Sequence, residues 1–179
     1  MSLSSPSLSF AFSFTQCTHK LYDARNFQQG PFQDIAPSKY QIEQICSAAS
    51  MSVERTQSIL DSKWMDFHFS PDGLKILVNT NSENLFVLDG FDSQIDPVII
   101  AERKNEAGLH FASCFSADGD YVFASNEDND IQIYDRIDAS LKTTLHGHIA
   151  PVLNVLCNPK YDLIASSCWN TVLWLRQQK

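Results

Sequence analysis

This chain of 179 residues lacks three common sequence motifs of enzymes. It has no Gly-x-Ser-x-Gly, no phosphate-binding P-loop and no Rossmann glycine pattern, so no motif marks a nucleophile or a nucleotide site. No two cysteines have Cys-x-x-Cys spacing, which leaves a zinc site without support. No apolar run approaches about 18 residues, so no membrane-spanning helix is predicted. The first residues lack a basic start and a compact leucine core, and they do not predict a signal peptide.

Basic residues are scarce as well. There are 13 lysines and arginines against 21 aspartates and glutamates, which gives a net charge of −8. Proteins that bind nucleic acid usually carry a basic patch, so we expect no direct nucleic-acid partner. An acidic surface that keeps the protein in solution is the simpler interpretation of the charge. The five cysteines are scattered and odd in number, which predicts free thiols in a reducing compartment: Cys17, Cys46, Cys114, Cys157 and Cys168.

The chain does contain one pattern that occurs three times. Hydrophobic residues make up 44% of the chain and charged residues 19%, as in a globular protein. The first repeat runs from Trp64 to Asp89, the second from Phe111 to Asp135 and the third from Val152 to Leu175. The Phe-Ser-x-Asp-Gly turn that begins at Phe69 recurs at Phe115, 46 residues later. The third repeat has Leu-Cys-Asn-Pro at the corresponding place.

The second repeat shows most clearly what each repeat folds into. A short apolar strand leads into the turn Ser116–Gly119, where glycine is free to take a positive φ. Residues 121–124 are apolar and predict a second strand, and residues 127–130 form a polar turn. Residues 131–135 alternate between apolar and polar side chains, as a strand with one buried face does. The order of strands and tight turns predicts an antiparallel meander.

A meander repeated about every 40–45 residues, with an aromatic residue and aspartate near its end, is typical of WD-repeat propeller blades. The predicted fold class is therefore all-β. It is an incomplete WD-repeat β-propeller of about three blades plus part of a fourth, each an antiparallel four-stranded sheet. Residues 98–101 and 142–145 are expected to be the outermost strands of the first and second blades.

The remaining residues divide into three segments ahead of the three blades at 64–179. Residues 1–18 are serine-rich and stay unassigned; residues 8–14 alternate as a strand at a sheet edge would, and a disordered or artefactual terminus is the alternative. Residues 19–35 contain Lys-Leu-Tyr-Asp, which predicts the last strand of a partial blade, followed by a loop with Gly30-Pro31. Residues 36–63 break the repeat and predict an insertion or linker, either a loop or a short helix.

Many WD repeats carry a Gly-His pair whose histidine bonds a structural aspartate, which satisfies two buried polar groups. Gly147-His148 precedes the third repeat, and Asp128 stands at the aspartate position of the second. No repeat has both partners, because the third has Cys168 near the aspartate position and the first has Ser82 there and Asp61 at the histidine position. We therefore expect this network inside each blade to be degraded.

No catalytic, cofactor-binding or metal-binding residue is predicted, and the chain is expected not to be an enzyme. His68, His110 and His148 each stand alone in their repeats, without a second ligand at metal-site spacing. Ser70 and Ser116 are turn formers, and the paired aspartates at 118/120 and 128/130 are explained by turn hydrogen bonding.

Tryptophan supplies the one candidate for a binding residue. Trp174 and Tyr134 stand where blades pack, and Trp64 fits the same role. Trp169 instead lies in the second turn of the third repeat, where a polar residue is expected. An aromatic side chain at a loop tip is a candidate contact with a protein partner.

Several segments in order resemble the C-terminal half of one WD-repeat subfamily. They are HKLYDARNFQQGPF, then ILVNTN followed by LDGFD, and finally NPKYDLIASSC-x-N-xx-LWL, and the similarity covers roughly 140 of the 179 residues. The subfamily is the small WD-repeat subunit of COMPASS-type histone lysine methyltransferase complexes, which is also found with a nuclear phosphatase and with transcript cleavage machinery. Its fold is a closed propeller of about seven blades, whereas this chain holds three repeats and one further strand.

The resemblance implies a nuclear, non-catalytic scaffold or adaptor. Its partners would be proteins, namely a histone methyltransferase complex and also the RNA polymerase C-terminal tail, with no cofactor and no membrane. The repeats by themselves are equally compatible with a generic interaction scaffold in ubiquitin ligation or signalling. A truncated fragment without function is the third reading of a chain with about half of the expected blades.

Overall fold

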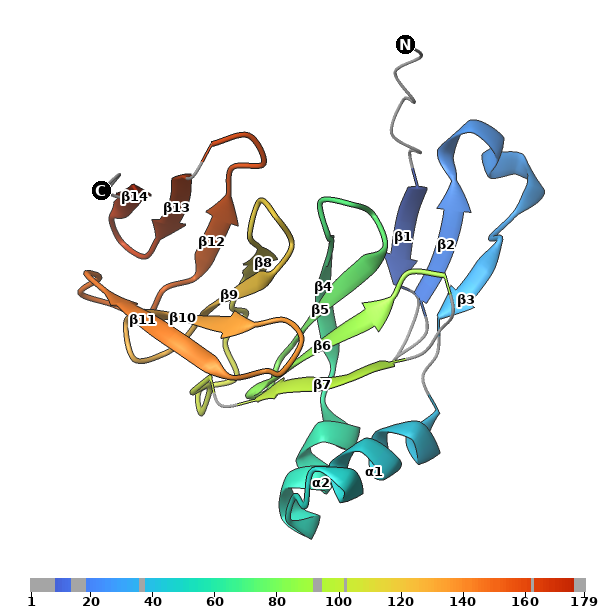
Figure 1. Ribbon diagram of the computed structural model, residues 1–179. Coiled ribbons are helices and arrows are strands. Elements are labelled where there is room, and N and C mark those ends of the chain that lie inside the picture. The colour runs from blue at the N-terminus through green and yellow to red at the C-terminus, as the bar shows by residue number, and fades with distance from the viewer. Residues whose placement is uncertain are drawn as a thin grey trace.

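In the computed structural model, four antiparallel sheets follow one another along an arc (Figure 1). The structure describes residues 9–13, 19–35, 38–91, 95–101, 103–161 and 163–175. Every hydrogen-bonded pair of strands consists of sequence neighbours, so each sheet is a meander. This arrangement confirms the predicted all-β fold, a β-propeller that is incomplete. No helix among these residues is long and apolar enough to cross a membrane.

The first repeat forms the four-stranded sheet β4 (Trp64–Phe69), β5 (Lys75–Thr80), β6 (Asn84–Asp89) and β7 (Ile95–Ala101). The second forms β8 (Ser113–Phe115), β9 (Tyr121–Ser125), β10 (Asp130–Asp135) and β11 (Leu141–His146). β7 and β11 are the outer strands that the sequence predicted. The third repeat has three described strands, β12 (Asn154–Cys157), β13 (Leu163–Ser167) and β14 (Thr171–Leu175).

The segment before the repeats forms a fourth sheet. β1 (Ser9–Ser13) pairs with β2 (His19–Asp23), which pairs with β3 (Gln33–Ile35). Of the two readings of residues 1–18, the strand at a sheet edge is the one observed for 9–13; residues 1–8 and 14–18, with Cys17, lie outside the described residues. Residues 19–35 hold two strands joined by the 3-10 helix η1 (Ala24–Gln29), where the sequence predicted one strand and a loop.

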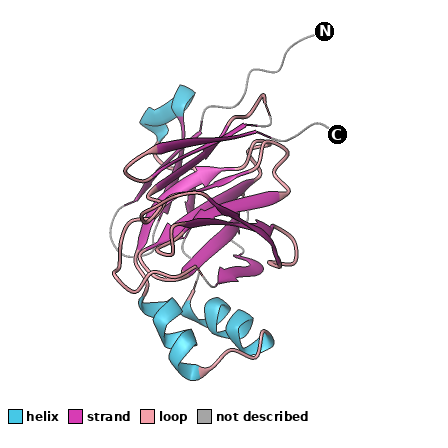
Figure 2. Ribbon diagram, turned by 90° about the vertical axis from the view of Figure 1, so that its left-hand side faces the viewer, coloured by secondary structure: helices cyan, strands magenta, loops and turns pink. Residues whose placement is uncertain are grey.

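Residues 36–63 contain two helices. The alternative of a loop was therefore wrong, and the alternative of a short helix named one helix where the structure has two. α1 (Lys39–Ala48) begins with a capping box in which Ser38 and Gln41 bond each other reciprocally. α2 (Val53–Asp61) begins at Ser52, whose side chain accepts from the Arg55 amide. The two helices lie together beyond one end of the sheets (Figures 1 and 2). Both serine caps are local signals that the sequence analysis did not use.

Three apolar clusters fill the spaces between successive sheets. The first joins Leu21 of β2 and both helices to the first repeat. The second joins Leu77, Leu85 and Val87 of the first repeat to the second repeat, and the third joins the second repeat to the third. Successive residues of a strand point to opposite faces, so Ile76 and Val78 face the first cluster while Leu77 faces the second. A central blade is buried on both faces for this reason.

Candidate functional site

The repeated Ser-x-Asp-Gly turns are built by side-chain hydrogen bonds. The Ser70 hydroxyl accepts from the Lys75 amide at 2.9 Å and donates to Asp72, whose carboxylate also accepts from the Leu74 amide at 3.0 Å. Ser116 and Asp118 repeat this arrangement in the second repeat. The bond from Ser70 is the main cause that lowers the pKa of the Asp72 carboxyl. These serines and aspartates are occupied in holding turns, as the sequence predicted.

The third repeat keeps a polar chain that the sequence analysis expected to be degraded. Trp174 Nε1 donates to Ser166 Oγ at 2.7 Å, and Ser166 Oγ lies 2.6 Å from His148 Nε2. His148 Nδ1 lies 3.3 Å from Asn170 Oδ1 and 3.1 Å from Cys168 Sγ. Ser166 Oγ has one proton and two lone pairs, so it can pair with Nε2 in either tautomer of His148, while Nδ1 faces Asn170 and Cys168. Asn170 thus substitutes for the missing aspartate, and the prediction was wrong for this repeat.

The other members of the expected network are dispersed. Asp128 forms an ion pair with Lys104 at 3.2 Å rather than with a histidine. Asp61 accepts from Gln57 at 2.9 Å at the end of α2, and Ser82 bonds Thr80 at 2.9 Å. The aspartate and histidine positions of the first two repeats therefore carry other local contacts.

Histidines do not gather into a metal site. Among the described residues no three side chains of His, Cys, Asp or Glu lie close enough to hold a metal ion. His68 does not stand alone, because its Nε2 lies 3.1 Å from Asp66 Oδ2, which lowers the pKa of that carboxyl. His110 is exposed and His148 is engaged in the third repeat. The sequence analysis missed this contact, although the spacing of two residues places Asp66 and His68 on one face of a strand and could have predicted it.

Trp169 stands out on the surface of the third repeat. It lies in the turn between β13 and β14 with 91% of its surface exposed, whereas Trp64 and Trp174 pack in the first and third clusters. Cys168, beside it, has an unusual thiol. Burial by itself would raise its pKa, but hydrogen bonds from the Asn170 backbone and from His148 lower the pKa to about 7. The turn therefore presents one large aromatic surface next to an acidic thiol.

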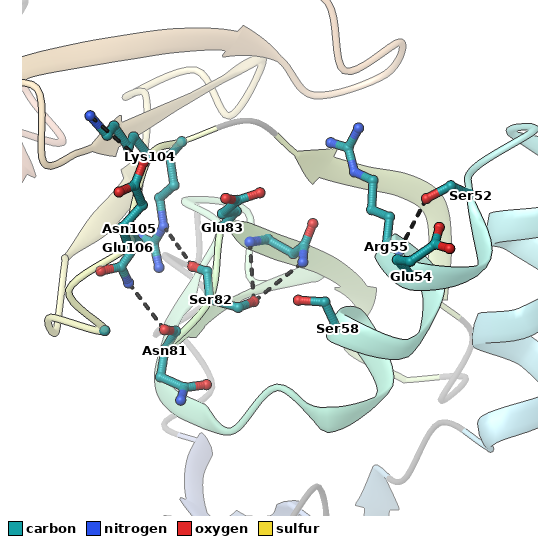
Figure 3. A pocket seen from close by; sticks show the side chains of 13 residues that line it. Ser52, Glu54, Arg55, Ser58, Asn81, Ser82, Glu83, Lys104, Asn105 and Glu106 are labelled. Carbon is teal, nitrogen blue, oxygen red and sulfur yellow. Dashed lines mark hydrogen bonds and ion pairs between the residues drawn. The ribbon is translucent and has the colours of Figure 1, made fainter.

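Sequence reasoning missed a polar cleft between α2 and the turn that joins β5 to β6 (Figure 3). Its volume is about 770 Å³, and its third wall is the segment 103–108. The segment is anchored by Arg103, which is 1% exposed and donates to the backbone oxygens of Thr80 at 2.6 Å, Phe111 at 3.2 Å and Ser82 at 3.4 Å. Burial lowers the pKa of Arg103 to about 10, so the guanidinium stays charged at neutral pH.

Comparison with known proteins finds similarity to a WD-repeat protein. The chain is 30% identical over 169 residues to WD repeat-containing protein 82 of Drosophila melanogaster. The aligned region covers 94% of this chain and 47% of the relative, so the chain spans about half the length of the protein it matches. No protein-family model matches the chain. The relative's name agrees with the repeats read from the sequence.

Proposed function

Because the chain is an arc of WD-repeat propeller blades, we propose that it is a non-catalytic scaffold subunit of a nuclear complex that methylates histone lysines. Proteins of this architecture carry function in loops that a rigid set of sheets holds in place. The observation that carries the proposal is the similarity to WD repeat-containing protein 82 along 94% of the chain. The segments quoted from the sequence, which resemble the COMPASS-type subunit, support the same assignment.

The surfaces for such a role are on the turns at the ends of the strands. Trp169 is almost wholly exposed at the β13–β14 turn, and large aromatic side chains dominate the binding energy of many protein interfaces. The chain has a net charge of −8, which favours protein partners with basic surfaces over nucleic acid. We propose a histone methyltransferase subunit as the principal partner, and the RNA polymerase C-terminal tail or a nuclear phosphatase as further ones.

Affinity purification of the tagged chain from nuclear extract tests the assignment. We expect methyltransferase subunits in the eluate, and phosphatase or transcript-termination subunits with them. A Trp169→Ala variant should lose a large share of these partners. The control is Tyr161→Ala, which removes an aromatic side chain, 61% exposed, from the turn at the opposite end of β13.

Two results would contradict the proposal in different ways. Recovery of ubiquitin-ligase or cytoplasmic signalling subunits in place of nuclear ones would favour the generic scaffold, which the 47% coverage of the relative leaves as the second candidate. Equal recovery with Trp169→Ala and with the unaltered chain would remove Trp169 from the interface while leaving the assignment to a complex intact.

A further inference from the structure

The thiol of Cys168 belongs to a group of polar atoms that the proposed function does not use. Cys168 is half-buried in the turn between β13 and β14, and its Sγ donates to Asn170 Oδ1 at 2.8 Å. His148 Nδ1 lies 3.1 Å from the same sulfur and 3.3 Å from Asn170 Oδ1. A sulfur, an imidazole and an amide are therefore within hydrogen-bonding distance of one another at the surface of the third repeat.

His148 is held toward this sulfur from its other side. Its Nε2 lies 2.6 Å from Ser166 Oγ, and only 8% of the residue is exposed. In either tautomer, loss of the thiol proton leaves an N–H group at Nδ1 facing the sulfur, because Nδ1 either carries a proton already or takes the one that the thiol loses. A nucleophile beside a nitrogen base that a third group orients is the arrangement that activates cysteines for covalent chemistry.

Backbone groups stabilise the anionic form of the same sulfur. Burial raises the pKa of the Cys168 thiol, but hydrogen bonds from the Asn170 backbone, from His148 and from the backbones of Ile149 and Trp169 lower it to about 7. About half of the thiol is therefore thiolate at neutral pH. The thiolate is the form of cysteine that attacks disulfides.

The other described cysteines have different surroundings. Burial raises the pKa of Cys46, and it raises that of Cys114 to about 12. Cys157 is half-buried like Cys168, but its Sγ donates to the carbonyl oxygen of Asn158 at 3.8 Å, a contact that favours the protonated thiol. Among these four thiols, Cys168 is the one whose surroundings favour the thiolate.

We propose that Cys168 is a site of reversible modification by small disulfides. The Cys168 thiolate attacks one sulfur of the disulfide, and a new S–S bond forms to Cys168. The S–S bond of the reagent breaks, and its second sulfur leaves as a thiolate that takes up a proton from water. Exchange conserves the number of disulfide bonds, so it needs no further oxidant.

Modification changes the turn that carries Trp169. The modified sulfur has no proton to donate to Asn170, and it carries a substituent where His148, Asn170 and the backbone amides now converge. The turn must move away from His148 to make room, and Trp169, which is 91% exposed, moves with it. A thiol reverses the exchange, so the turn acts as a redox switch.

Labelling of the folded chain with 2-hydroxyethyl disulfide, a neutral reagent, tests the proposal. Peptide mass spectrometry at pH 7 should find the mixed disulfide at Cys168 before Cys46, Cys114 and Cys157, and dithiothreitol should remove it. The tryptophan fluorescence should change with the modification and return with the reductant. The control is Cys168→Ser, which keeps a hydrogen-bonding group but has no thiol, and its fluorescence should not respond to the reagent.

A second variant, Asn170→Asp, separates activation of the thiol from its exposure. It places a carboxylate of the same shape beside the sulfur, which disfavours the thiolate, while His148 can still donate to it. We expect Cys168 to react about fivefold more slowly at pH 7, because the loss of thiolate outweighs the greater nucleophilicity of a more basic one. The melting temperature should not fall below that of the parent.

Three results would overturn the proposal. An unchanged rate in Asn170→Asp would show that the surroundings of the sulfur do not activate it. Labelling of Cys157 as fast as Cys168 would mean that exposure alone determines reactivity. Modification of Cys168 without a change in fluorescence would mean that the turn does not respond.

Discussion

Ser166 accepts from Trp174 and also hydrogen-bonds His148, so at the residue scale one hydroxyl links two large side chains inside the third blade. This series of hydrogen bonds, from Trp174 through Ser166 and His148 to Asn170, runs from β14 to the turn after β13. Each member satisfies a neighbour that is partly or wholly buried, and an unmade hydrogen bond there is more costly than one at the surface. This series of hydrogen bonds has two measurable consequences, one for stability and one for reactivity.

Ser166→Ala is expected to lower the free energy of unfolding by about 1–3 kcal/mol, because Trp174 Nε1 and His148 Nε2 each lose their partner. Urea unfolding at pH 7, followed by tryptophan fluorescence, measures the change. Ser167→Ala is the matched control, since its hydroxyl makes only a 3.4 Å contact with Asn154, and we expect a change within about 0.5 kcal/mol. Equal losses in the two variants would show that the hydrogen bonds of Ser166 add no stability.

Cys168 is expected to be alkylated by iodoacetamide with a pH midpoint near 7, because the thiolate is the reactive form and its pKa is about 7. Its rate should rise as the pH increases through 7. Cys114 should stay unmodified in the folded protein, since burial raises the pKa of its thiol to about 12. Peptide mass spectrometry after timed labelling gives both rates. A midpoint near 9 for Cys168 would mean that His148 and the Asn170 backbone do not stabilise the thiolate.

At the scale of the elements, α1 and α2 belong to the core although they interrupt the repeats. Ile59 of α2 is 1% exposed and Cys46 of α1 is 1% exposed, and both lie in the cluster that also holds Trp64 and Phe86. The rings of Trp64 and Phe86 pack at an angle of 37° with their centres 5.6 Å apart. The helices therefore contribute to the burial of the first repeat and also form one wall of the cleft.

Ile59→Ala is expected to cost about 2–5 kcal/mol, because it leaves a cavity in the cluster shared by the helices and the first blade. Val53→Ala, on the same helix but 81% exposed, should change the free energy of unfolding by no more than about 0.5 kcal/mol. Thermal or urea unfolding of the two variants gives the comparison. A small loss for Ile59→Ala would indicate that α2 rests on the sheets without stabilising them.

For the whole molecule, the open end of the arc matters most. With no further blade beyond it, the third repeat should expose either Val152, Val155, Ile164 and Leu173 or the residues on the opposite face. Val152 and Val155 are fully buried and Ile164 packs against them, whereas Leu173 is 61% exposed. The open face is the opposite one, with Leu156 at 59% and Leu175 at 76%. Among the described residues no strand pairs with the outer edge of β14.

The purified chain of 179 residues is therefore expected to self-associate or to unfold at low urea concentration. Each leucine left out of a core forgoes about 1.5–3 kcal/mol, against total stabilities of about 5–15 kcal/mol. Size-exclusion chromatography should show Leu173→Lys shifting the protein toward monomer, because a charge on this face opposes pairing. Ile137→Lys, at a turn and 74% exposed, should have no such effect. A monodisperse monomer with a steep urea transition in the unaltered chain would contradict the expectation.

The sequence alone determined the meanders, the turns and the incomplete propeller, because these depend on local signals. Strand periodicity of two and the Ser-x-Asp-Gly turns act within a few residues. The caps at Ser38 and Ser52 are also local, but they were not recognised, and 36–63 was left open between loop and helix. The aromatic exposure of Trp169 was also anticipated from its position in a turn.

Only the tertiary structure decided which groups meet across the chain. Alternation assigns Val155 and Leu156 to opposite faces of a strand, but it cannot say which face meets the neighbouring blade. Asn170 could replace an aspartate because the turn brings its amide to His148, and Arg103 is buried because carbonyls from residues 80, 82 and 111 converge on it. These contacts join residues up to 23 positions apart, and their geometry exists only once the sheets have packed.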